Sequence, residues 1–303
     1  MSRITAAFKN KPIFMPYFPL GYPDLDTSIN VIEALAKNGA DLIEVGLSFS
    51  DPLADGPVIQ RATQVALENG ITIKKSLEAV RELRKRGVDI PLVLMGYYNP
   101  MLAYGLEKFV CDAIVAGADG FIIPDLPMEE SEEFISALRG ATVGRVDSGE
   151  LPPSYRDQGN TVEARGDSTN RPSSAPLHGS AQDGDIPLIP MLAPTSSPDR
   201  MELIARNAKG FIYLVSVTGV TGERKSISEG LGDLISRVRE HTSAPVCVGF
   251  GISTPEQAKE VGKMADGVIV GTACVRTIGE SEKPIATAKK FAASFHEALN
   301  GKG

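Results

Sequence analysis

The sequence predicts an α/β protein whose single domain is a (β/α)8 TIM barrel. Short apolar runs rich in β-branched residues alternate along the chain with longer stretches of helical periodicity. The runs are apolar throughout, as parallel strands covered on both faces require. No G-x-G-x-x-G motif follows the first run, which disfavours the alternative fold, a doubly wound open sheet.

Eight apolar runs are expected strands. Each ends near Gly, Pro, Asp or Ser, residues that favour turns. In chain order the expected strands are Ile13–Phe18, Leu42–Leu47, Ile90–Met95, Gly120–Ile123, Ile186–Leu192, Gly210–Val215, Pro245–Phe250 and Asp266–Val270. Eight parallel strands that alternate with helices close into a barrel of about 250 residues.

The stretches between these strands keep apolar residues on one face at helical spacing. The expected helices are Ser28–Asn38, Lys75–Arg86, Leu106–Ala116, Glu129–Leu138, Arg200–Asn207, Leu231–His241, Pro255–Met264 and Pro284–Leu299. A short helix over Met1–Phe8 is expected to lead into the first strand, and another helix to begin near Val58.

Composition restricts the class of protein. The chain has 303 residues, enough for one large barrel or two small domains, and 42% are hydrophobic, as in ordinary globular proteins. The formal net charge of -7 disfavours a nucleic-acid partner. The chain has neither an apolar run of about 20 residues nor the features of a signal peptide, which predicts a cytoplasmic protein with no membrane partner.

The cysteines Cys111, Cys247 and Cys274 lie far apart and form no C-x-x-C pair. The sequence therefore predicts neither a disulfide framework nor a zinc ribbon. Widely spaced single cysteines are typical of proteins from a reducing compartment.

One segment, 141–185, interrupts the alternation between the fourth helix and the fifth strand. It is poor in hydrophobic residues and rich in Gly, Pro and Ser, a composition typical of disorder. We expect residues 1–303 to form one barrel domain with 141–185 as an insertion within it, because the remaining length suits a barrel. A solvated insertion is favoured over the alternative, a partner-binding or regulatory loop.

Acidic residues mark the end of the second expected strand. Glu44 lies inside this apolar strand, where burial should raise its pKa until it can exchange a proton near neutral pH. The loop that follows carries Asp51 and Asp55. Asp51 fits a turn residue, and Asp55 fits either a helix cap or a catalytic carboxylate. For Glu44 the alternative is a carboxylate satisfied by a neighbouring polar group.

Glycine-rich segments follow the sixth, seventh and eighth expected strands, at Ser216–Gly222, Gly249–Ser253 and Gly271–Ala273. Glycine lets backbone N–H groups approach an anion, and barrels of this class commonly bind phosphate after strands seven and eight. The three segments together predict a phosphate site.

Five motifs together resemble the tryptophan synthase alpha subunit family. They are Pro16–Pro23, Leu42–Pro57, Met95–Pro100, Pro124–Pro127 and Gly219–Gly222. The resemblance covers almost the whole chain except 141–185. The block from Glu44 to Pro57 is the most specific part, whereas the Gly-Phe-Gly sequence alone would fit several phosphate-binding barrels.

The resemblance implies a carbon–carbon lyase that splits indole-3-glycerol phosphate into indole and glyceraldehyde 3-phosphate. This retro-aldol cleavage requires an acid for the indole ring carbon and a base for the glycerol hydroxyl. Glu44 matches the family's acid/base residue. Asp55 matches its second carboxylate, which holds the indole N–H and stabilises the positive charge on the ring.

The resemblance also implies the substrate-binding residues. The phosphate cradle corresponds to the backbone N–H groups of Gly222, Gly251, Gly271 and Thr272, with Thr272 where serine is common. The positions that line the indole pocket correspond to Phe18, Ile59, Tyr97 and Tyr213, although each could be an ordinary core residue. The loop Thr221–Ser226 resembles the family's mobile lid.

Family membership would imply a pyridoxal-phosphate-dependent beta subunit in an αββα heterotetramer, with indole passed through a tunnel to make L-tryptophan. The pyridoxal phosphate belongs to the beta chain, so no cofactor or metal is expected here. Three alternatives remain: another phosphosugar barrel enzyme, an alpha fold kept only to activate a beta subunit, and a stand-alone indole-releasing lyase.

Overall fold

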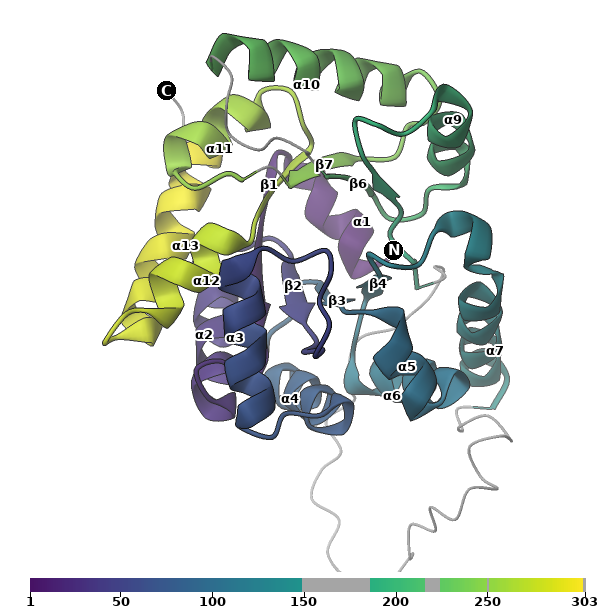
Figure 1. Cartoon of the computed structure of the whole chain (residues 1–303), viewed down its shortest axis with the longest axis vertical. Coiled ribbons are helices and arrows are strands. Elements are labelled where there is room, and N and C mark those ends of the chain that lie inside the picture. Colours follow the sequence, from purple (N-terminus) through teal and green to yellow (C-terminus); the bar gives the residue numbers. More distant parts are fainter. Residues whose placement is uncertain (149–185, 216–223, 250, 302–303) are drawn as a thin grey trace, which may run out of the picture.

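The computed structural model describes residues 1–148, 186–215, 224–249 and 251–301. Its strands form one parallel sheet in the order β4-β3-β2-β1-β8-β7-β6-β5 (Figure 1). Their bounds are β1 Ile13–Pro19, β2 Ile43–Gly46, β3 Leu92–Met95, β4 Gly120–Ile122, β5 Met191–Leu192, β6 Ile212–Val215, β7 Val246–Gly249 and β8 Gly267–Val270.

The two edges of this sheet meet and close the barrel. Phe121 in β4 forms a parallel bridge with Leu188, just before β5. The N–H of Phe121 donates to the carbonyl of Pro187 at 2.9 Å, and the N–H of Ile189 donates to the carbonyl of Phe121 at 2.8 Å. The predicted (β/α)8 barrel is confirmed.

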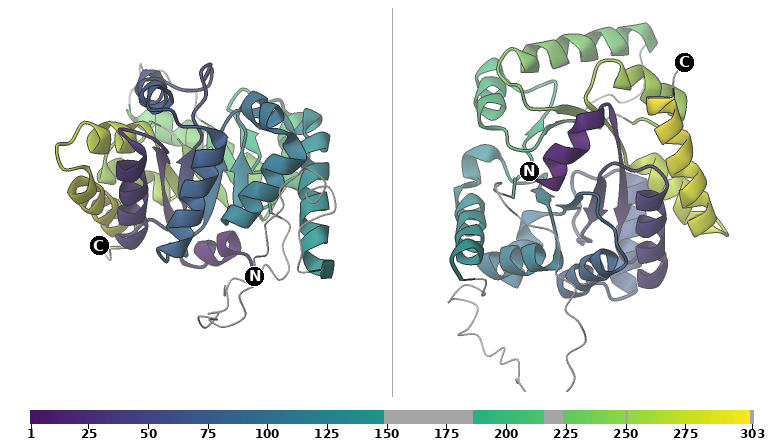
Figure 2. Two further views of the ribbon diagram at one scale, coloured as in Figure 1. Left: turned by 90° about the horizontal axis from the view of Figure 1, so that it is seen from below. Right: turned by 180° about the vertical axis from the view of Figure 1, so that it is seen from behind.

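Helices surround the strands (Figures 1 and 2). Their bounds are α1 Arg3–Ala7, α2 Leu25–Lys37, α3 Pro57–Glu68, α4 Ile73–Lys85, α5 Tyr98–Tyr104, α6 Leu106–Ala116, α7 Glu132–Ser148, α9 Pro198–Asn207, α10 Arg224–Arg239, α11 Pro255–Gly262, α12 Thr272–Gly279 and α13 Pro284–Asn300, with short 3-10 turns at Phe8–Asn10 and Met128–Glu130. None of the helices in the described ranges is long and apolar enough to cross a membrane.

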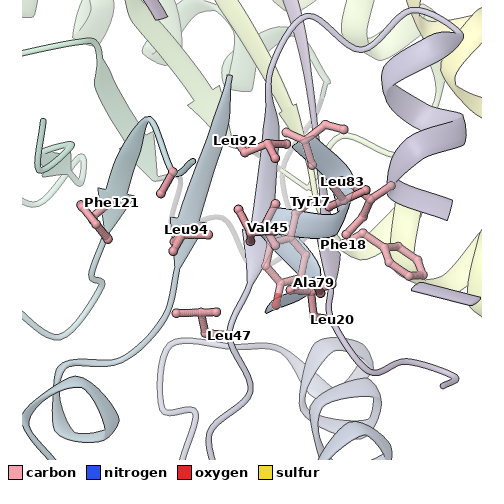
Figure 3. Packing of buried hydrophobic residues seen from close by; sticks show 14 of the residues in the cluster. Tyr17, Phe18, Leu20, Val45, Leu47, Ala79, Leu83, Leu92, Leu94 and Phe121 are labelled. Atoms are coloured by element: carbon pink, nitrogen blue, oxygen red, sulfur yellow. The ribbon is translucent and has the colours of Figure 1, made fainter. Parts of the chain in front are cut away.

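Two apolar layers hold the barrel together. The larger layer lies between the strands and the helices, and Figure 3 shows part of it, including Phe18, Val45 and Leu94. A smaller cluster of inward side chains fills the barrel, among them Met15 and Val93. Because successive side chains of a strand point to opposite faces, the inner residues alternate with the outer ones.

Helix α1 covers the N-terminal end of the barrel. Ile4 is 1% exposed and belongs to the inner cluster. Phe8, just after the helix, packs against Phe211 with ring centroids 5.8 Å apart. The loop between β2 and α3 lies at the opposite end of the strands (Figures 1 and 2).

Three aspartates fasten neighbouring strands at this same N-terminal end. Each lies just before or at the start of a strand and accepts a hydrogen bond from an amide of the adjacent strand, at 2.8 to 3.0 Å. The pairs are Asp41 with Phe14, Asp119 with Leu92, and Asp266 with Val246. Each carboxylate thus satisfies an amide at the start of the strand beside it.

The fifth strand and the interrupting segment differ in length from the prediction. Strand β5 covers only Met191–Leu192 instead of Ile186–Leu192, because Pro187 and Pro190 lack the N–H group that a regular ladder needs. Helix α7 continues to Ser148, so the start of the segment 141–185 is helical, and Ala141 is buried. Residues 149–185 lie outside the described ranges.

Candidate active site

Glu44 lies in β2 and points into the barrel. It is paired in register with Tyr17 of β1 and with Val93 of β3, a member of the inner cluster. Glu44 is 1% exposed, and its Oε1 atom has no hydrogen-bond partner in the described part of the chain. Burial raises the pKa of Glu44 to about 8. The carboxyl group is therefore mostly protonated at neutral pH and can act as a proton donor.

Asp55 lies on the loop between β2 and α3. Burial raises the pKa of its carboxyl to about 6, although a hydrogen bond with the Tyr97 hydroxyl opposes this rise. The Tyr97 hydroxyl also accepts the N–H of Ala54 at 2.9 Å, which ties the loop to the end of β3. Asp55 does not cap α3, because the N-cap is Gly56 and it has no side-chain cap. At neutral pH Asp55 is largely ionised.

Asp51 plays a different part on the same loop. Its side chain is exposed and accepts a hydrogen bond from the Ser50 hydroxyl at 2.7 Å, and its carbonyl accepts the N–H of Leu53 at 2.9 Å. These short-range bonds are those of a turn residue, as the sequence indicated.

Two tyrosines face the carboxylates from opposite parts of the barrel wall. Burial and the nearby Asp55 and Glu44 raise the pKa of Tyr17 on β1. Burial and the charges of Glu44 and Asp55 likewise raise the pKa of Tyr213 on β6. Tyr213 is among the pocket residues predicted from the sequence, whereas Tyr17 is not.

Each tyrosine ring occupies space that a glycine leaves on the neighbouring strand. A methyl group at Gly46 would lie 2.7 Å from Cζ of Tyr17, and one at Gly249 would lie 2.8 Å from Cζ of Tyr213. Contacts this short do not occur between real side chains, so both glycines make room for a ring. The tyrosines can therefore lie flat along the wall toward the ends of β2 and β7.

Phe18 differs from the prediction. It is fully buried, belongs to the layer between strands and helices, and lies 6.3 Å from the ring of Tyr22 (Figure 3). The reason is the alternation of side chains along β1, which turns Tyr17 inward and Phe18 outward. On β1, the ring that points into the barrel is therefore that of the tyrosine and not that of the phenylalanine.

Ile59 reaches the same region from α3. A methyl group at Gly271 would lie 3.7 Å from both Cδ1 of Ile59 and Cβ of Tyr17. Ile59 therefore lies between the loop that carries Asp55 and the end of β8. Together with Tyr97 and Tyr213 it stays a predicted residue of the indole pocket.

Three of the residues predicted to bind phosphate, Gly251, Gly271 and Thr272, lie in the described ranges. Gly251 has φ of 54°, a backbone conformation that favours glycine, and a methyl group there would meet no atom of the described residues within 4 Å. Gly271 is the N-cap of α12 and offers no side-chain cap, so the first N–H groups of the helix, beginning with Thr272, lack a capping side chain. Gly222 and the first half of the loop Thr221–Ser226, residues 221–223, lie outside the described residues, whereas the second half, from Arg224, is the start of α10.

The described residues contain no group of three or more His, Cys, Asp or Glu side chains arranged to hold a metal ion. Cys111, Cys247 and Cys274 are all buried and free. The raised pKa values of Glu44 and Asp55 suit these carboxyls to proton transfer, and a helix N-terminus without a side-chain cap, as at α12, favours an anion.

Comparison with known proteins gives one consistent result. The family model "Tryptophan synthase alpha chain" matches residues 4–148 and 171–301. The tryptophan synthase alpha chain of Chloroflexus aggregans is 42% identical over 280 residues, which cover 91% of this chain and 89% of that one. The alpha chain of Geobacillus stearothermophilus is 40% identical over 285 residues, covering 94% and 90%.

Solved structures agree. The crystal structure of the tryptophan synthase alpha subunit from Legionella pneumophila has a TM-score of 0.78 and 30% identity, covering 100% of both chains. A tryptophan synthase structure from Mycobacterium tuberculosis has a TM-score of 0.78 and 29% identity, covering 99% of both. Sequence, fold and the geometry of the two carboxylates lead to one assignment: the chain belongs to the tryptophan synthase alpha chain family.

Proposed function

We propose that Glu44 and Asp55 are the catalytic carboxylates with which this chain carries out the lyase reaction of its family. The chain, as a member of that family, cleaves indole-3-glycerol phosphate to indole and glyceraldehyde 3-phosphate. The observation that carries the assignment of roles is the separation of the two pKa values, about 8 for Glu44 and about 6 for Asp55. Near neutral pH, Glu44 keeps its proton and Asp55 is an anion. Acid–base catalysis needs one group in each of these two states.

Glu44 is the proton donor and then the proton acceptor. Its protonated carboxyl gives a proton to the indole ring carbon that bears the glycerol chain, which turns the ring into an electron sink. The carbon–carbon bond then breaks, its electrons return to the ring, and the neighbouring glycerol hydroxyl becomes the aldehyde of glyceraldehyde 3-phosphate. The proton of that hydroxyl passes to the Glu44 carboxylate, so the residue ends the cycle as it began.

Asp55 stabilises the charge that develops. Its carboxylate accepts a hydrogen bond from the indole N–H and faces the positive charge on the protonated ring. The hydrogen bond from Tyr97 holds the Asp55 carboxyl in place. Ile59 and the Tyr213 ring supply apolar surface for the indole beside it.

The phosphate of the substrate is proposed to bind Gly251, Gly271 and Thr272, together with Gly222. The open backbone at Gly251 and the uncapped start of α12 support this assignment. Backbone N–H groups at a helix N-terminus favour a phosphate both by hydrogen bonding and through the helix dipole.

The partner is proposed to be a tryptophan synthase beta subunit, in an αββα heterotetramer that passes indole onward. The loop that carries Asp55 also presents Leu53, which is 92% exposed, a suitable apolar contact for a partner. In this assembly the pyridoxal phosphate belongs to the beta chain, and this chain carries no cofactor of its own. The cytoplasm is the proposed compartment.

The first test is the replacement of each carboxylate by its amide. We expect Glu44→Gln to abolish indole release while substrate binding changes little, because the amide keeps the shape of the site but cannot transfer the proton. Asp55→Asn should lower kcat by roughly a hundredfold or more, the size of effect typical of a lost electrostatic stabiliser. Indole release is measured with the full chain, alone and with the beta subunit.

Asp51→Asn is the matched control, since Asp51 is an exposed carboxylate of the same loop and should leave the chemistry unchanged. Near-normal turnover by Glu44→Gln would refute its role. Absence of indole release by the unaltered chain even with the beta subunit would favour a non-catalytic alpha fold. Release without the beta subunit at the full rate would instead support a stand-alone lyase.

A further inference from the structure

The hydroxyl group of Tyr17 has no assigned role in the reaction, although the structure pairs Tyr17 with Glu44 and places its hydroxyl over the end of β2. Tyr17 is paired in register with Glu44, and both side chains point into the barrel. Its ring crosses Gly46, the residue two positions after Glu44 on the same inner face of β2. The hydroxyl therefore lies over β2, just beyond Glu44 in the direction of the loop that carries Asp55.

Two further observations concern the partners of this hydroxyl. Oε1 of Glu44 is one of two buried side-chain atoms without a hydrogen-bond partner in the described ranges, and such an atom is expected to find one in the working protein. Among charged groups, Asp55 raises the pKa of Tyr17 most, followed by Glu44. A tyrosine hydroxyl can accept one hydrogen bond and donate another, which suits a place between a protonated and an ionised carboxyl.

We propose that Tyr17 is a positioning residue whose hydroxyl bridges the two carboxylates before the proton is transferred to the substrate, accepting a hydrogen bond from protonated Glu44 and donating one to ionised Asp55. The bridge keeps the single shared proton on Glu44, where the reaction needs it, and keeps Asp55 an anion. This inference rests on the proposed roles of Glu44 and Asp55.

Tyr213 does not fill this place. It belongs to β6, which pairs with β5 and β7, and its ring lies over Gly249 rather than over β2. Glu44 raises the pKa of Tyr213 more than Asp55 does, whereas at Tyr17 the order of the two carboxylates is reversed. The titratable groups that face the bridge are Glu44, Asp55, Tyr97, Tyr213 and Cys247.

The test is the pH dependence of Tyr17→Phe, which removes one oxygen and keeps the ring. In the unaltered chain, kcat/KM for indole release should have a bell-shaped pH profile. Its acidic limb should report the pKa of Asp55, and its alkaline limb should report the pKa of Glu44. Without the hydroxyl, Asp55 loses a donor to its anion, so its pKa rises. Glu44 loses an acceptor for its proton, so its pKa falls.

The pH profile of kcat/KM for Tyr17→Phe should therefore be narrower than that of the unaltered chain on both sides, by about one pH unit in total. Its kcat at the optimal pH should be lowered about tenfold. The substrate's own phosphate ionises equally with both proteins and cancels in the comparison. Direct titration of the labelled Glu44 carboxyl by carbon-13 NMR, without substrate, should show the same fall in its pKa.

Two further variants check the assignment. Gly46→Ala keeps the hydroxyl but forces the ring of Tyr17 away, so it should narrow the bell in the same way. Tyr104→Phe is the control: its hydroxyl donates to Asp112 at 2.7 Å on the helical face of the barrel, and its loss should leave both limbs in place.

An unchanged bell for Tyr17→Phe, or narrowing by Tyr213→Phe in its place, overturns the bridge. Either result leaves the proposed function standing as long as Glu44→Gln is inactive. If Glu44→Gln remains active, the proposed function fails instead, and the NMR titration still decides whether Tyr17 holds the proton on Glu44.

Discussion

At the scale of single residues, the site is maintained at a cost to the stability of the fold. Glu44 is a buried carboxyl whose pKa in the folded chain, about 8, lies above its ordinary value of 4.5. The folded state thus binds this proton more tightly than the unfolded state does. The stabilisation that this bound proton gives to the folded state is complete below pH 4.5 and is lost as the pH rises through 8.

The expected consequence is that Glu44→Gln stabilises the protein at alkaline pH. The neutral amide avoids the buried charge, so the variant's free energy of unfolding should exceed that of the parent by several kcal/mol, roughly 3 to 5, at pH 9. At pH 4.5 the difference should nearly vanish. Urea unfolding at both pH values measures it, and an equal difference at the two would contradict the assigned pKa.

The residues that the sequence could predict are those with an unusual chemical type for their place. A carboxylate inside an apolar strand singles out Glu44, and a second one in the following loop singles out Asp55. Tyr17 and Phe18 are both apolar enough for a strand buried on both faces, so nothing local says which one points inward. That choice follows from the register between β1 and β2, a long-range property.

At the scale of elements, strand ends are held by carboxylates that have permanent partners. Burial acts to raise the pKa of Asp266, but hydrogen bonds from Lys11, from the N–H of Val246 and from Arg239 outweigh it, so the pKa is lowered. The folded state therefore favours the anion. This stabilisation is present above the ordinary value of 3.8 and is lost as the pH falls through the lowered value.

Asp266→Asn should accordingly destabilise the protein by roughly 1 to 3 kcal/mol at pH 7, because it leaves buried donors with a weaker acceptor. The loss should shrink toward pH 3, where the parent itself begins to protonate. Chemical unfolding at the two pH values, with the exposed Asp51→Asn as reference, tests this expectation. A loss that is independent of pH would indicate altered packing rather than a lost anion.

Among the elements, the sequence predicted the eight barrel strands and the long helices, because each has a clear period. It did not predict the short helices α5 and α12. Helix α5 spans only Tyr98–Tyr104 and contains Pro100, so it lacks a recognisable apolar repeat. Helix α12 begins in the glycine-rich segment Gly271–Ala273, whose composition is typical of a loop. Strand β5 is shorter than predicted because Pro187 and Pro190 have no N–H group to donate.

At the scale of the whole molecule, the segment between α7 and β5 is proposed to be an insertion within one barrel domain. The family model leaves residues 149–170 unmatched. A connection from a helix to the next strand belongs to the end of the barrel opposite the active site. We therefore expect the site described above not to depend on this segment.

We expect removal of residues 149–185, replaced by a short Gly/Ser linker, to leave kcat/KM for indole release within about twofold. A longer deletion, of 141–185, provides the comparison, because it also removes the last part of α7 with the buried Ala141 and should lower the midpoint of thermal unfolding. A large loss of activity in the shorter deletion would show that the segment is structural or regulatory.

The closure of the barrel also has a consequence for the order in which the protein is made. Strand β1 pairs on one side with β8, through contacts such as Ile13 with Gly267, and Phe8 meets Phe211 across the barrel floor. While a ribosome synthesises the chain, the first strand therefore keeps one hydrogen-bonding edge unpaired until the last unit emerges. Since unpaired strand edges invite intermolecular association, the nascent chain is most vulnerable to aggregation just before its synthesis is complete.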